Sequence, residues 1–401
     1  MNDTDTRHPL RVLALTHNHI SEPCTFVRIF TPLQALKSTG RVAYTVQRLM
    51  PWSVMNLRHT LRHLHEWDVI WMARPRHYTM LPLIRRAHAL GKPILIDIDD
   101  WLLDVPAEHV DADFYRTRPL QETVYTALRT VDAVTTSTEA IAERCAALGV
   151  RAHLLPNAID CTQFTRQERS GETTTIAFCG TSSHYEDVPL IVPALRQLLE
   201  QDRHRVRVVS VGCPIPGLED CAEYSHHAFV DAPQYPQFMS DLRIDIGLAP
   251  LHDTAFNRAK SDVKYLEYSA TGAATIASPV APYRASIHED RGLLVSANTP
   301  EAWTATIFRL VQEPDLRQRL ATSAYEWVRN ERSIEATADM WFAIFDDYAN
   351  AHVPSAPPGA RQLDAGRFER VLANIVVRQT PYDAIQLRDR LVQTIRAATY
   401  K

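Results

Sequence analysis

Short apolar runs typical of buried strands alternate with helix-like patterns along this chain, and this alternation constrains the fold more than any other feature. The strand-like runs form two groups, at residues 11–16, 69–72, 94–97 and 133–136 and then at 174–180, 206–211, 244–249 and 274–278. Apolar residues at helical spacing separate most of them, at residues 25–39, 79–90, 118–130, 187–201 and 233–241. Strands joined through helices favour parallel sheets that are covered on both faces. The sequence therefore predicts an α/β chain with two Rossmann-like, doubly wound domains that face each other across a cleft.

The length of the chain supports two domains of similar size, because 401 residues exceed one ordinary core. We expect the first domain at residues 1–158 and the second at 159–350. Three further helical patterns should complete the second domain, at residues 300–312, 314–330 and 334–350.

A proline-rich break separates a tail from this body. Residues 352–360 carry three prolines and a glycine, a composition that interrupts a helix. Residues 361–401 then show apolar residues at helical spacing. We expect residues 351–401 to form a linker and a helical appendage. The appendage could serve homo-oligomerisation or partner binding, and it could equally be a cap on the body.

The composition excludes several classes of protein. Hydrophobic residues make up 45% and charged residues 22% of the chain, as in ordinary globular proteins. No run approaches the roughly 20 apolar residues of a membrane helix, and the polar start lacks the apolar core of a signal peptide, so we expect a cytoplasmic protein. The formal net charge of −4 argues against nucleic acid as a partner. A basic stretch around Arg41, Arg48, Arg58 and Arg62 leaves open a peripheral contact with the inner face of the membrane.

The segment 258–278 carries the clearest chemical signal. It reads as a cationic loop with Arg258, a helix opened by Ser261 or Asp262, a stop at Gly272 and a short buried strand. The start of such a helix presents free backbone N–H groups and the positive end of its dipole, which suits a diphosphate. We therefore expect Ser261 and Asp262 to bind the donor.

Charged side chains on this helix extend the signal. Lys260 and Lys264 add two positive charges for a diphosphate, and Glu267 follows Lys264 on the same helical face, where it can accept hydrogen bonds from vicinal hydroxyls. Phosphate and diol together indicate a nucleotide or a nucleotide sugar. On spacing alone, Lys264 and Glu267 could equally be an exposed ion pair.

At these residues the chain resembles the large family of retaining, nucleotide-sugar-dependent glycosyltransferases with the GT-B fold. That family carries a Glu-x7-Glu pattern, and its second glutamate, which binds the nucleotide ribose, matches Glu267, with Gly272 and Ser278 in register behind it. The first glutamate is replaced by Ala259. The family's contact to the donor sugar is therefore expected from Asn257, Arg258 or the backbone of 260–262.

Three other segments extend the resemblance over most of the chain. Residues 155–164 resemble the connection between the two domains of these enzymes, residues 245–251 the strand before the donor helix, and residues 291–295 the hairpin after it. The resemblance implies a GT-B architecture in which the last helix of the body packs back on the first domain.

The loop after the first strand of the second domain is a second candidate for phosphate binding. Its backbone amides and side chains can cradle a phosphate, because it follows a buried strand and precedes a helix. The family places an arginine and a lysine near this loop, and this chain has neither between residues 180 and 187. We therefore expect Lys260 and Lys264 to carry the positive charge and four residues of the loop to act as neutral donors, namely Gly180, Thr181, Ser182 and His184.

Polar residues also follow the strands of the first domain. Asp97, Asp99 and Asp100 could suggest a metal motif, but they lie across the cleft from the predicted diphosphate site. We expect Asp99 and Asp100 to act in catalysis, by bonding the donor sugar or the acceptor, and Asp97 either to do the same or to be structural. The remaining acceptor-side candidates are two histidines in the first loop and two arginines suited to an anionic acceptor, namely His17, His19, Arg74 and Arg76.

Metal and cofactor sites are not expected. The six cysteines form no Cys-x-x-Cys pair and no cysteine–histidine cluster. The predicted catalytic residues are Lys260, Lys264, Asp99 and Asp100, with no cofactor besides the nucleoside diphosphate sugar as co-substrate.

The sequence as a whole leads to a hypothesis of retaining glycosyl transfer to a glycan or lipid-linked acceptor in surface-glycan synthesis. Three alternatives stay open: a non-catalytic binder of sugar nucleotides, a glycosyltransferase acting on modified nucleic acid bases, and a sugar phosphorylase of the same fold.

Overall fold

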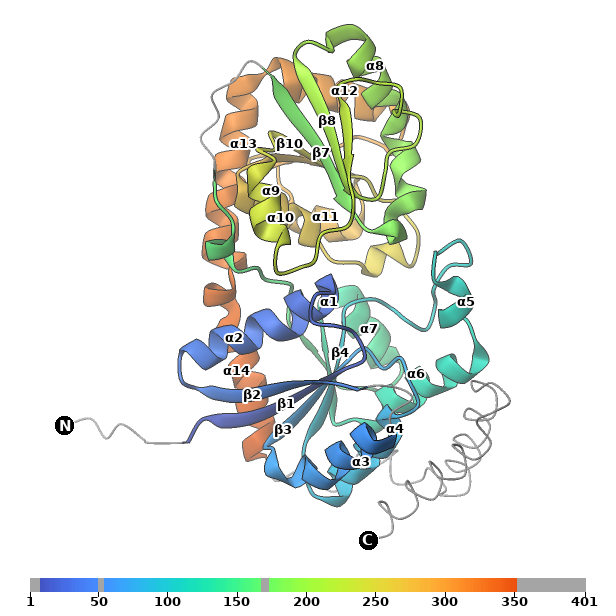
Figure 1. Ribbon diagram of the computed structural model, residues 1–401, viewed down its shortest axis with the longest axis vertical. Coiled ribbons are helices and arrows are strands. Elements are labelled where there is room, and N and C mark those ends of the chain that lie inside the picture. Colours follow the sequence, from blue (N-terminus) through green and yellow to red (C-terminus); the bar gives the residue numbers. More distant parts are fainter. Residues whose placement is uncertain (1–7, 50–53, 167–172, 352–401) are drawn as a thin grey trace, which may run out of the picture.

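The computed structural model of the protein describes residues 8–49, 54–166 and 173–351. In this part of the chain two parallel sheets lie one above the other along the long axis, each covered by helices (Figure 1). The helical tail predicted at 361–401, with its expected role in assembly, lies outside the described residues.

The first sheet has six parallel strands in the order β2-β1-β3-β4-β5-β6. They are β1 (Leu10–Thr16), β2 (Val42–Arg48), β3 (Val69–Ala73), β4 (Ile94–Ile98), β5 (Ala133–Thr136) and β6 (Ala152–Leu154). The helical segments around this sheet are α1 (Pro23–Thr25), η1 (Phe26–Phe30), α2 (Thr31–Ser38), α3 (Val54–His63), η2 (Leu64–Glu66), α4 (Met80–Ala89), α5 (Ala112–Tyr115), α6 (Arg118–Thr130) and α7 (Glu139–Ala147). Buried runs such as Val69–Ala73, covered on both faces, form this sheet as predicted.

The second sheet is also six-stranded and parallel, in the order β12-β11-β10-β7-β8-β9. Its strands are β7 (Thr174–Gly180), β8 (Val206–Gly212), β9 (Tyr224–His227), β10 (Ile246–Ala249), β11 (Ala274–Ala277) and β12 (Leu293–Leu294). The helical segments that follow the first sheet are η3 (Cys161–Gln163), η4 (Ser182–Leu190), α8 (Val192–Asp202), α9 (Tyr235–Asp241), η5 (Asn257–Ala259), α10 (Val263–Thr271), α11 (Ala281–Ser286), α12 (Pro300–Gln312), α13 (Pro314–Trp327), η6 (Val328–Arg332) and α14 (Ile334–Asn350).

One predicted helix of this sheet starts later than its apolar pattern suggests. The prediction began it at residue 187, whereas the chain forms a 3-10 segment over Ser182–Leu190 and α8 only from Val192. Pro189 lacks the N–H that an α-helix interior requires, and Pro193 fits the first turn of α8. The connection between β7 and α8 is therefore longer than predicted.

The last helix, α14, packs against the first sheet after the chain has built the second (Figure 1). Trp341 and Phe345 of α14 contact Trp71 of β3 edge-on, at ring-centroid distances of 5.4 and 5.1 Å. A parallel bridge between Ile159 and Ser333 joins the start of α14 to the segment between the sheets. The two halves are thus connected twice by the chain.

A buried ion pair organises the first half near this connection. Arg28 donates two hydrogen bonds to Asp97, at 3.0 and 2.7 Å, and both side chains are 2% exposed. The remaining nitrogen, Nη1 of Arg28, donates hydrogen bonds to the carbonyl oxygen of Leu155 and to Oδ1 of Asn157. The guanidinium also lies 4.8 Å from the ring centre of Trp341. Asp97 therefore has the structural role, while Arg28 links the sheet to the connecting segment.

A glycine in β10 sets the position of α10. A Cβ atom on Gly247 would lie 2.3 Å from the ring of Tyr268, so only glycine lets this helix approach so closely. The Tyr268 hydroxyl accepts a hydrogen bond from the backbone N–H of Cys179 in β7. Helix α10 is thereby held with its first turn at the carboxyl ends of β7 and β10.

Candidate functional site

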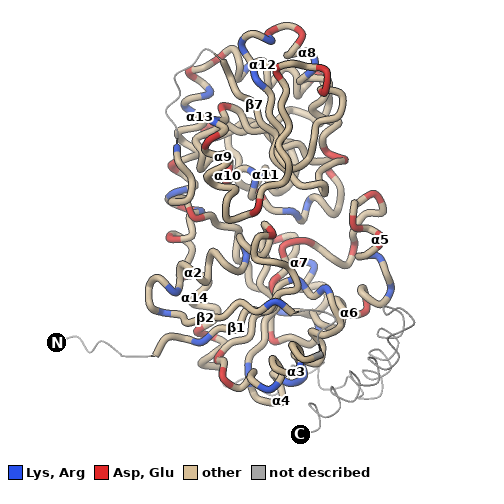
Figure 2. The backbone as a smooth tube through the Cα atoms, in the orientation of Figure 1, with Lys and Arg blue, Asp and Glu red and all other residues tan. Residues whose placement is uncertain are grey.

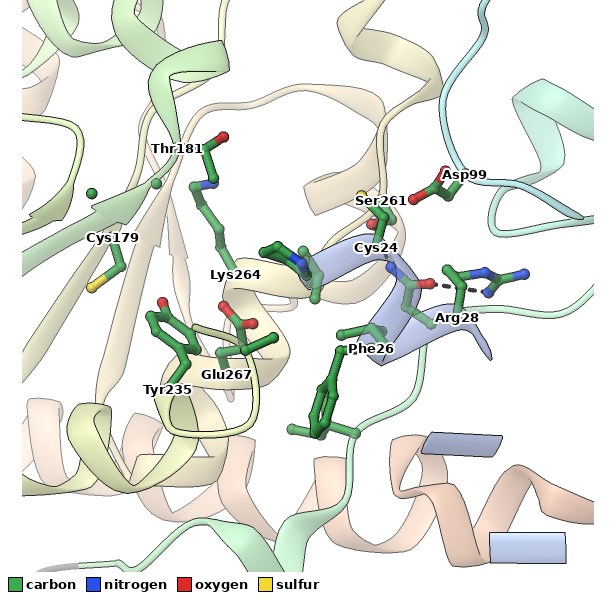
Figure 3. A pocket seen from close by; sticks show the side chains of 18 of the residues that line it. Cys24, Phe26, Arg28, Asp99, Cys179, Thr181, Tyr235, Ser261, Lys264 and Glu267 are labelled. Carbon is green, nitrogen blue, oxygen red and sulfur yellow. Dashed lines mark hydrogen bonds between the residues drawn. The ribbon is translucent and has the colours of Figure 1, made fainter. Parts of the chain in front are cut away.

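A cavity of about 270 Å³ lies between the two halves, at the carboxyl ends of the strands (Figure 3). Its lining comes from α1 and η1, from the ends of β4, β7 and β8, from α9 and α10, and from the connecting segment at residues 157–164. Pockets of roughly this size hold small-molecule ligands, and in doubly wound sheets they lie at this edge. The cavity is therefore the candidate site.

Lys264 and Glu267 of α10 both line the cavity, together with Tyr235 of α9 (Figure 3). Lys264 is 8% exposed, and burial lowers the pKa of its ammonium group to about 8, with the charge of Lys260 adding to the effect. Burial likewise raises the pKa of Glu267 to about 7, against the opposing effects of Lys264 and of a hydrogen bond from the Tyr235 hydroxyl. This burial is inconsistent with an exposed ion pair on a solvated helix.

The N-terminal residues of this helix have different roles. Ser261 lines the cavity and accepts a hydrogen bond from the side chain of Asn157, at 2.8 Å. Asp262 does not line it: its carboxylate accepts two hydrogen bonds of 2.9 Å from Arg332 and a third from Ser286. The prediction that Asp262 binds the donor is not supported by this geometry, because its carboxylate already stabilises the contact with η6.

The loop before α10 is docked on the first half of the molecule. Phe256 and Ala259, 5% and 1% exposed, belong to the core that covers the first sheet. The carbonyl of Ala259 accepts a hydrogen bond from Thr138, at 2.9 Å, and Arg144 donates to the carbonyl of Ala255. A glutamate could not be accommodated at position 259 without burying its charge in this core.

The two polar residues that precede Ala259 have partners outside the cavity. Arg258 pairs with Asp253 and is exposed, and the side-chain amide of Asn257 donates to the carbonyl of His252. Neither residue lines the cavity, so the expected contact of Asn257 or Arg258 with a donor sugar is not supported. Lys260 does line it, with its ammonium group 5.3 Å from the ring centre of Phe256.

The loop after β7 contributes Gly180, Thr181, Ser183 and His184 to the lining of the cavity. The hydroxyls of Thr181 and Ser183 hydrogen-bond each other at 2.8 Å. Ser182 is exposed and does not line the cavity. Because the loop begins with a 3-10 turn, Ser183 rather than Ser182 faces inward.

Gly212 at the end of β8 also lines the cavity, although it was not among the residues predicted from the sequence. Gly212 has a φ of +80°, and a Cβ atom there would lie 2.5 Å from the carbonyl oxygen of Gly180. Only glycine fits this close approach of two strand ends. A glycine directly after the apolar run at 206–211 could have indicated this close approach of the backbone.

Arg74, Asp99 and Asp100 form a charged group on the first half of the cavity wall. The guanidinium of Arg74 forms ion pairs with both carboxylates: Nε pairs with Asp99, and Nη2 lies 2.8 Å from Oδ2 of Asp100. Arg74 also has a positive φ of 37°, which is strained for a residue other than glycine. Its charge is thus already matched, which does not support the prediction that Arg74 receives an anionic acceptor.

The other acceptor-side candidates lie off the main cavity. His17 is partly exposed and hydrogen-bonds Thr79, and desolvation of its imidazole lowers the pKa to about 3. His19 bonds Ser21 beside it. Arg76 lies over the rings of Phe114 and Tyr115, 5.7 and 5.9 Å from their centres. None of these three side chains lines the main cavity.

Within residues 8–49, 54–166 and 173–351, no three His, Cys, Asp or Glu side chains are arranged to hold a metal ion. In the same part of the chain, no helix combines the length and the apolarity needed to cross a membrane. Lys and Arg are interspersed with Asp and Glu over both halves (Figure 2).

Comparison with known proteins shows the class of fold. Residues 190–343 match a family described as glycosyl transferase-like. The Anabaena protein HepE, crystallised with UDP and glucose, superposes with a TM-score of 0.62 at 13% identity, over 84% of this chain and all of that one. Sucrose-phosphate synthase from Thermosynechococcus elongatus superposes with a TM-score of 0.59 at 15% identity, over 84% of this chain and 98% of the other. The fold is therefore GT-B.

One curated protein matches at the level of sequence. The D-inositol 3-phosphate glycosyltransferase of Corynebacterium efficiens is 25% identical over an alignment of 207 residues that covers 48% of this chain. The chain spans about half of that relative, 47% of its length. The matched family region at 190–343 contains α10 and the loop after β10, and so both lysines of the candidate site.

Proposed function

We propose that the protein is a glycosyltransferase that moves a sugar from a nucleoside diphosphate sugar to an acceptor hydroxyl, with retention of configuration. The observation that carries this proposal is that Lys260, just before α10, and Lys264 and Glu267 of α10 line the cavity between the two sheets, with Lys264 only 8% exposed. The match of residues 190–343 to a glycosyl transferase-like family supports it, as does the likeness to a protein crystallised with UDP-glucose.

The donor would lie along α10. Lys260 and Lys264 neutralise the diphosphate, assisted by the hydroxyls of Thr181 and Ser183. Glu267 accepts hydrogen bonds from the ribose hydroxyls, and the Tyr235 hydroxyl orients its carboxylate. Because Gly212 keeps the end of β8 free of side-chain atoms, the nucleoside can approach the backbone there.

The chemical step needs no nucleophile from the protein. The bond between the anomeric carbon of the sugar and the diphosphate breaks with its electron pair on the phosphate oxygen, which accepts the proton of the acceptor hydroxyl on the same face. The acceptor oxygen then forms its bond to the anomeric carbon on that face. The protein contributes orientation and stabilises the negative charge of the leaving diphosphate. Asp99 and Asp100, held by Arg74, face the cavity from the other half and would bond the acceptor or the sugar.

We further propose that the acceptor is a glycan or a lipid-linked glycan, in surface-glycan synthesis in the cytoplasm. A second candidate function is a binder of sugar nucleotides without turnover. The burial of Ala259 favours it, because the position that carries a glutamate in related enzymes cannot reach a sugar in this arrangement.

A ligand screen followed by a turnover assay separates these functions. We expect nucleoside diphosphates to raise the melting temperature, since a ligand at 100 times its dissociation constant stabilises by ~2.7 kcal/mol. The matching diphosphate sugar should then be hydrolysed or transferred. Binding without any turnover across a panel of donors and acceptors would favour the non-catalytic binder, and the absence of binding to the folded protein would contradict both.

Activity should persist in excess EDTA. Lys260 and Lys264 can neutralise a diphosphate directly, and Asp99 and Asp100 are engaged by Arg74. The measurement is the rate of donor hydrolysis or transfer before and after chelation. A loss of activity that magnesium or manganese restores would contradict this prediction and require a metal site.

A further inference from the structure

His184 and Asp187 form a buried pair in the wall of the cavity, and the roles proposed above leave it unused. Nδ1 of His184 lies 3.0 Å from Oδ2 of Asp187, and the two side chains are 12% and 5% exposed. Oδ1 of Asp187 accepts a hydrogen bond of 2.8 Å from the backbone N–H of His252. His184 lines the cavity and Asp187 does not. The carboxylate therefore holds one edge of the imidazole from behind.

This contact decides which nitrogen of His184 carries the hydrogen. An ionised carboxylate only accepts hydrogen bonds, and Asp187 accepts one from each side. Nδ1 must then be the donor, so that in the neutral ring Nε2 keeps its lone pair. Among the described residues, Nε2 has no hydrogen-bond partner. The free edge of the ring is an acceptor.

The unliganded site keeps this imidazole neutral. Burial lowers the pKa of His184 well below its ordinary value, and the positive charges of Lys264 and Lys260, with a smaller effect of His109, act in the same direction. Asp187 is the negative group that faces the ring. Burial raises the pKa of this carboxyl, against the hydrogen bond from His252 and the charges of Lys260 and Lys264.

We propose that His184 takes up a proton when a diphosphate binds beside it and then serves as a third cation of the donor site. The inference rests on the proposed function, because it requires a diphosphate in this cavity. A lone pair on Nε2 would repel a phosphate oxygen, whereas an imidazolium donates a charge-assisted hydrogen bond to it. Asp187 stabilises the imidazolium from behind.

The proton balance of this step is simple. The proton comes from solvent on binding, stays on Nε2 while the sugar is transferred, and returns to solvent as the diphosphate leaves. The acceptor hydroxyl still gives its own proton to the phosphate oxygen. Between residues 180 and 187 the chain has no lysine or arginine, so His184 is the side chain of this loop that can acquire a positive charge.

The test measures proton uptake on binding. UDP and ADP are titrated calorimetrically at neutral pH in buffers of different ionisation enthalpy. Wild type should take up more protons than His184→Gln, and its affinity should increase as the pH falls, by at most about tenfold per pH unit for one proton. Lys264 and Glu267 also titrate near neutrality, but they are present in both proteins, so the difference reports His184.

Asp187→Asn provides a sharper variant. An asparagine amide can still accept from the N–H of His252, but its NH₂ group donates to Nδ1 of His184. The neutral ring then carries its hydrogen on Nε2 and can bond a phosphate without taking up a proton. We expect this variant to bind UDP or ADP with the smaller uptake of His184→Gln. If His184→Gln fails to fold, the comparison of Asp187→Asn with wild type still provides the test.

The matched control is His204→Gln, which changes an exposed histidine before β8, at the opposite strand end from the cavity. It should keep the wild-type uptake. Equal uptake in wild type and in the folded variants at His184 and Asp187 would overturn the inference while leaving the proposed function intact. If folded wild type binds no nucleoside diphosphate, the proposed function fails, and this inference fails with it.

Discussion

Lys264→Ala should lower kcat by roughly ten- to a thousand-fold, because it removes a positive charge that faces the leaving diphosphate. Lys264 is nearly buried beside Lys260 in the cavity, where a charge is screened less than in water. The diphosphate becomes more negative as the bond to the sugar breaks, so the lost interaction is stronger in the transition state than in the bound donor. Steady-state kinetics with a saturating donor measure the effect.

Glu267→Gln is the matched comparison on the same face of α10. It keeps the shape of the side chain but weakens hydrogen bonds to ribose hydroxyls that are present before and during the reaction. KM for the donor should therefore rise more than kcat falls. Wild-type kinetics in both folded variants would show that α10 is not the donor site and would remove the main support for the proposed function.

Arg28→Ala should destabilise the first half of the molecule by about 3–5 kcal/mol, the typical result of removing one partner from a buried ion pair. Asp97 would lose two hydrogen bonds in a position where burial already raises the pKa of its carboxyl. The carbonyl of Leu155 would lose its donor as well. Denaturant titration of the variant and the wild type gives the change in the free energy of unfolding.

Arg11→Ala is the control for this prediction. Arg11 also pairs with an aspartate through two side-chain hydrogen bonds, but the side chains of Arg11 and Asp68 are 52% and 30% exposed. Exposed pairs contribute about 0–1 kcal/mol, so this variant should differ little from wild type. Similar losses in both variants would contradict the structural role given to the Arg28–Asp97 pair.

The helices and strands predicted best from the sequence are those whose residues and immediate flanking residues determine the local backbone conformation. The helix expected to begin near Ser261 or Asp262 and to stop at Gly272 is α10, Val263–Thr271, with Gly272 at a φ of 77°. The alternation of apolar runs predicted two parallel sheets, which the structure confirms. The edge strands β2, β6 and β9 were missed, because they contain few buried residues and lack an apolar run.

The candidate site could be predicted only in part, for a different reason. Lys260, Lys264, Glu267, Thr181 and His184 line the cavity, since a strand end or a helix start places them there. The local sequence pattern could not show which polar side chains are already hydrogen-bonded to residues that are distant along the chain. The partner of Asp262 is Arg332, 70 residues away, and Ala259 is buried by the other half of the molecule.

The sequence by itself determined the periodicity of the chain, and with it the two sheets, the helix of the candidate site and the edge where strand ends meet. Only the tertiary structure decided which charged groups face the cavity and which are paired elsewhere. Arg74 with Asp99 and Asp100, and Arg28 with Asp97, become partners through packing between separate strands and helices. Backbone conformation depends mainly on adjacent residues, whereas the charge and exposure of a side chain depend on groups that are distant along the chain and adjacent only in the fold.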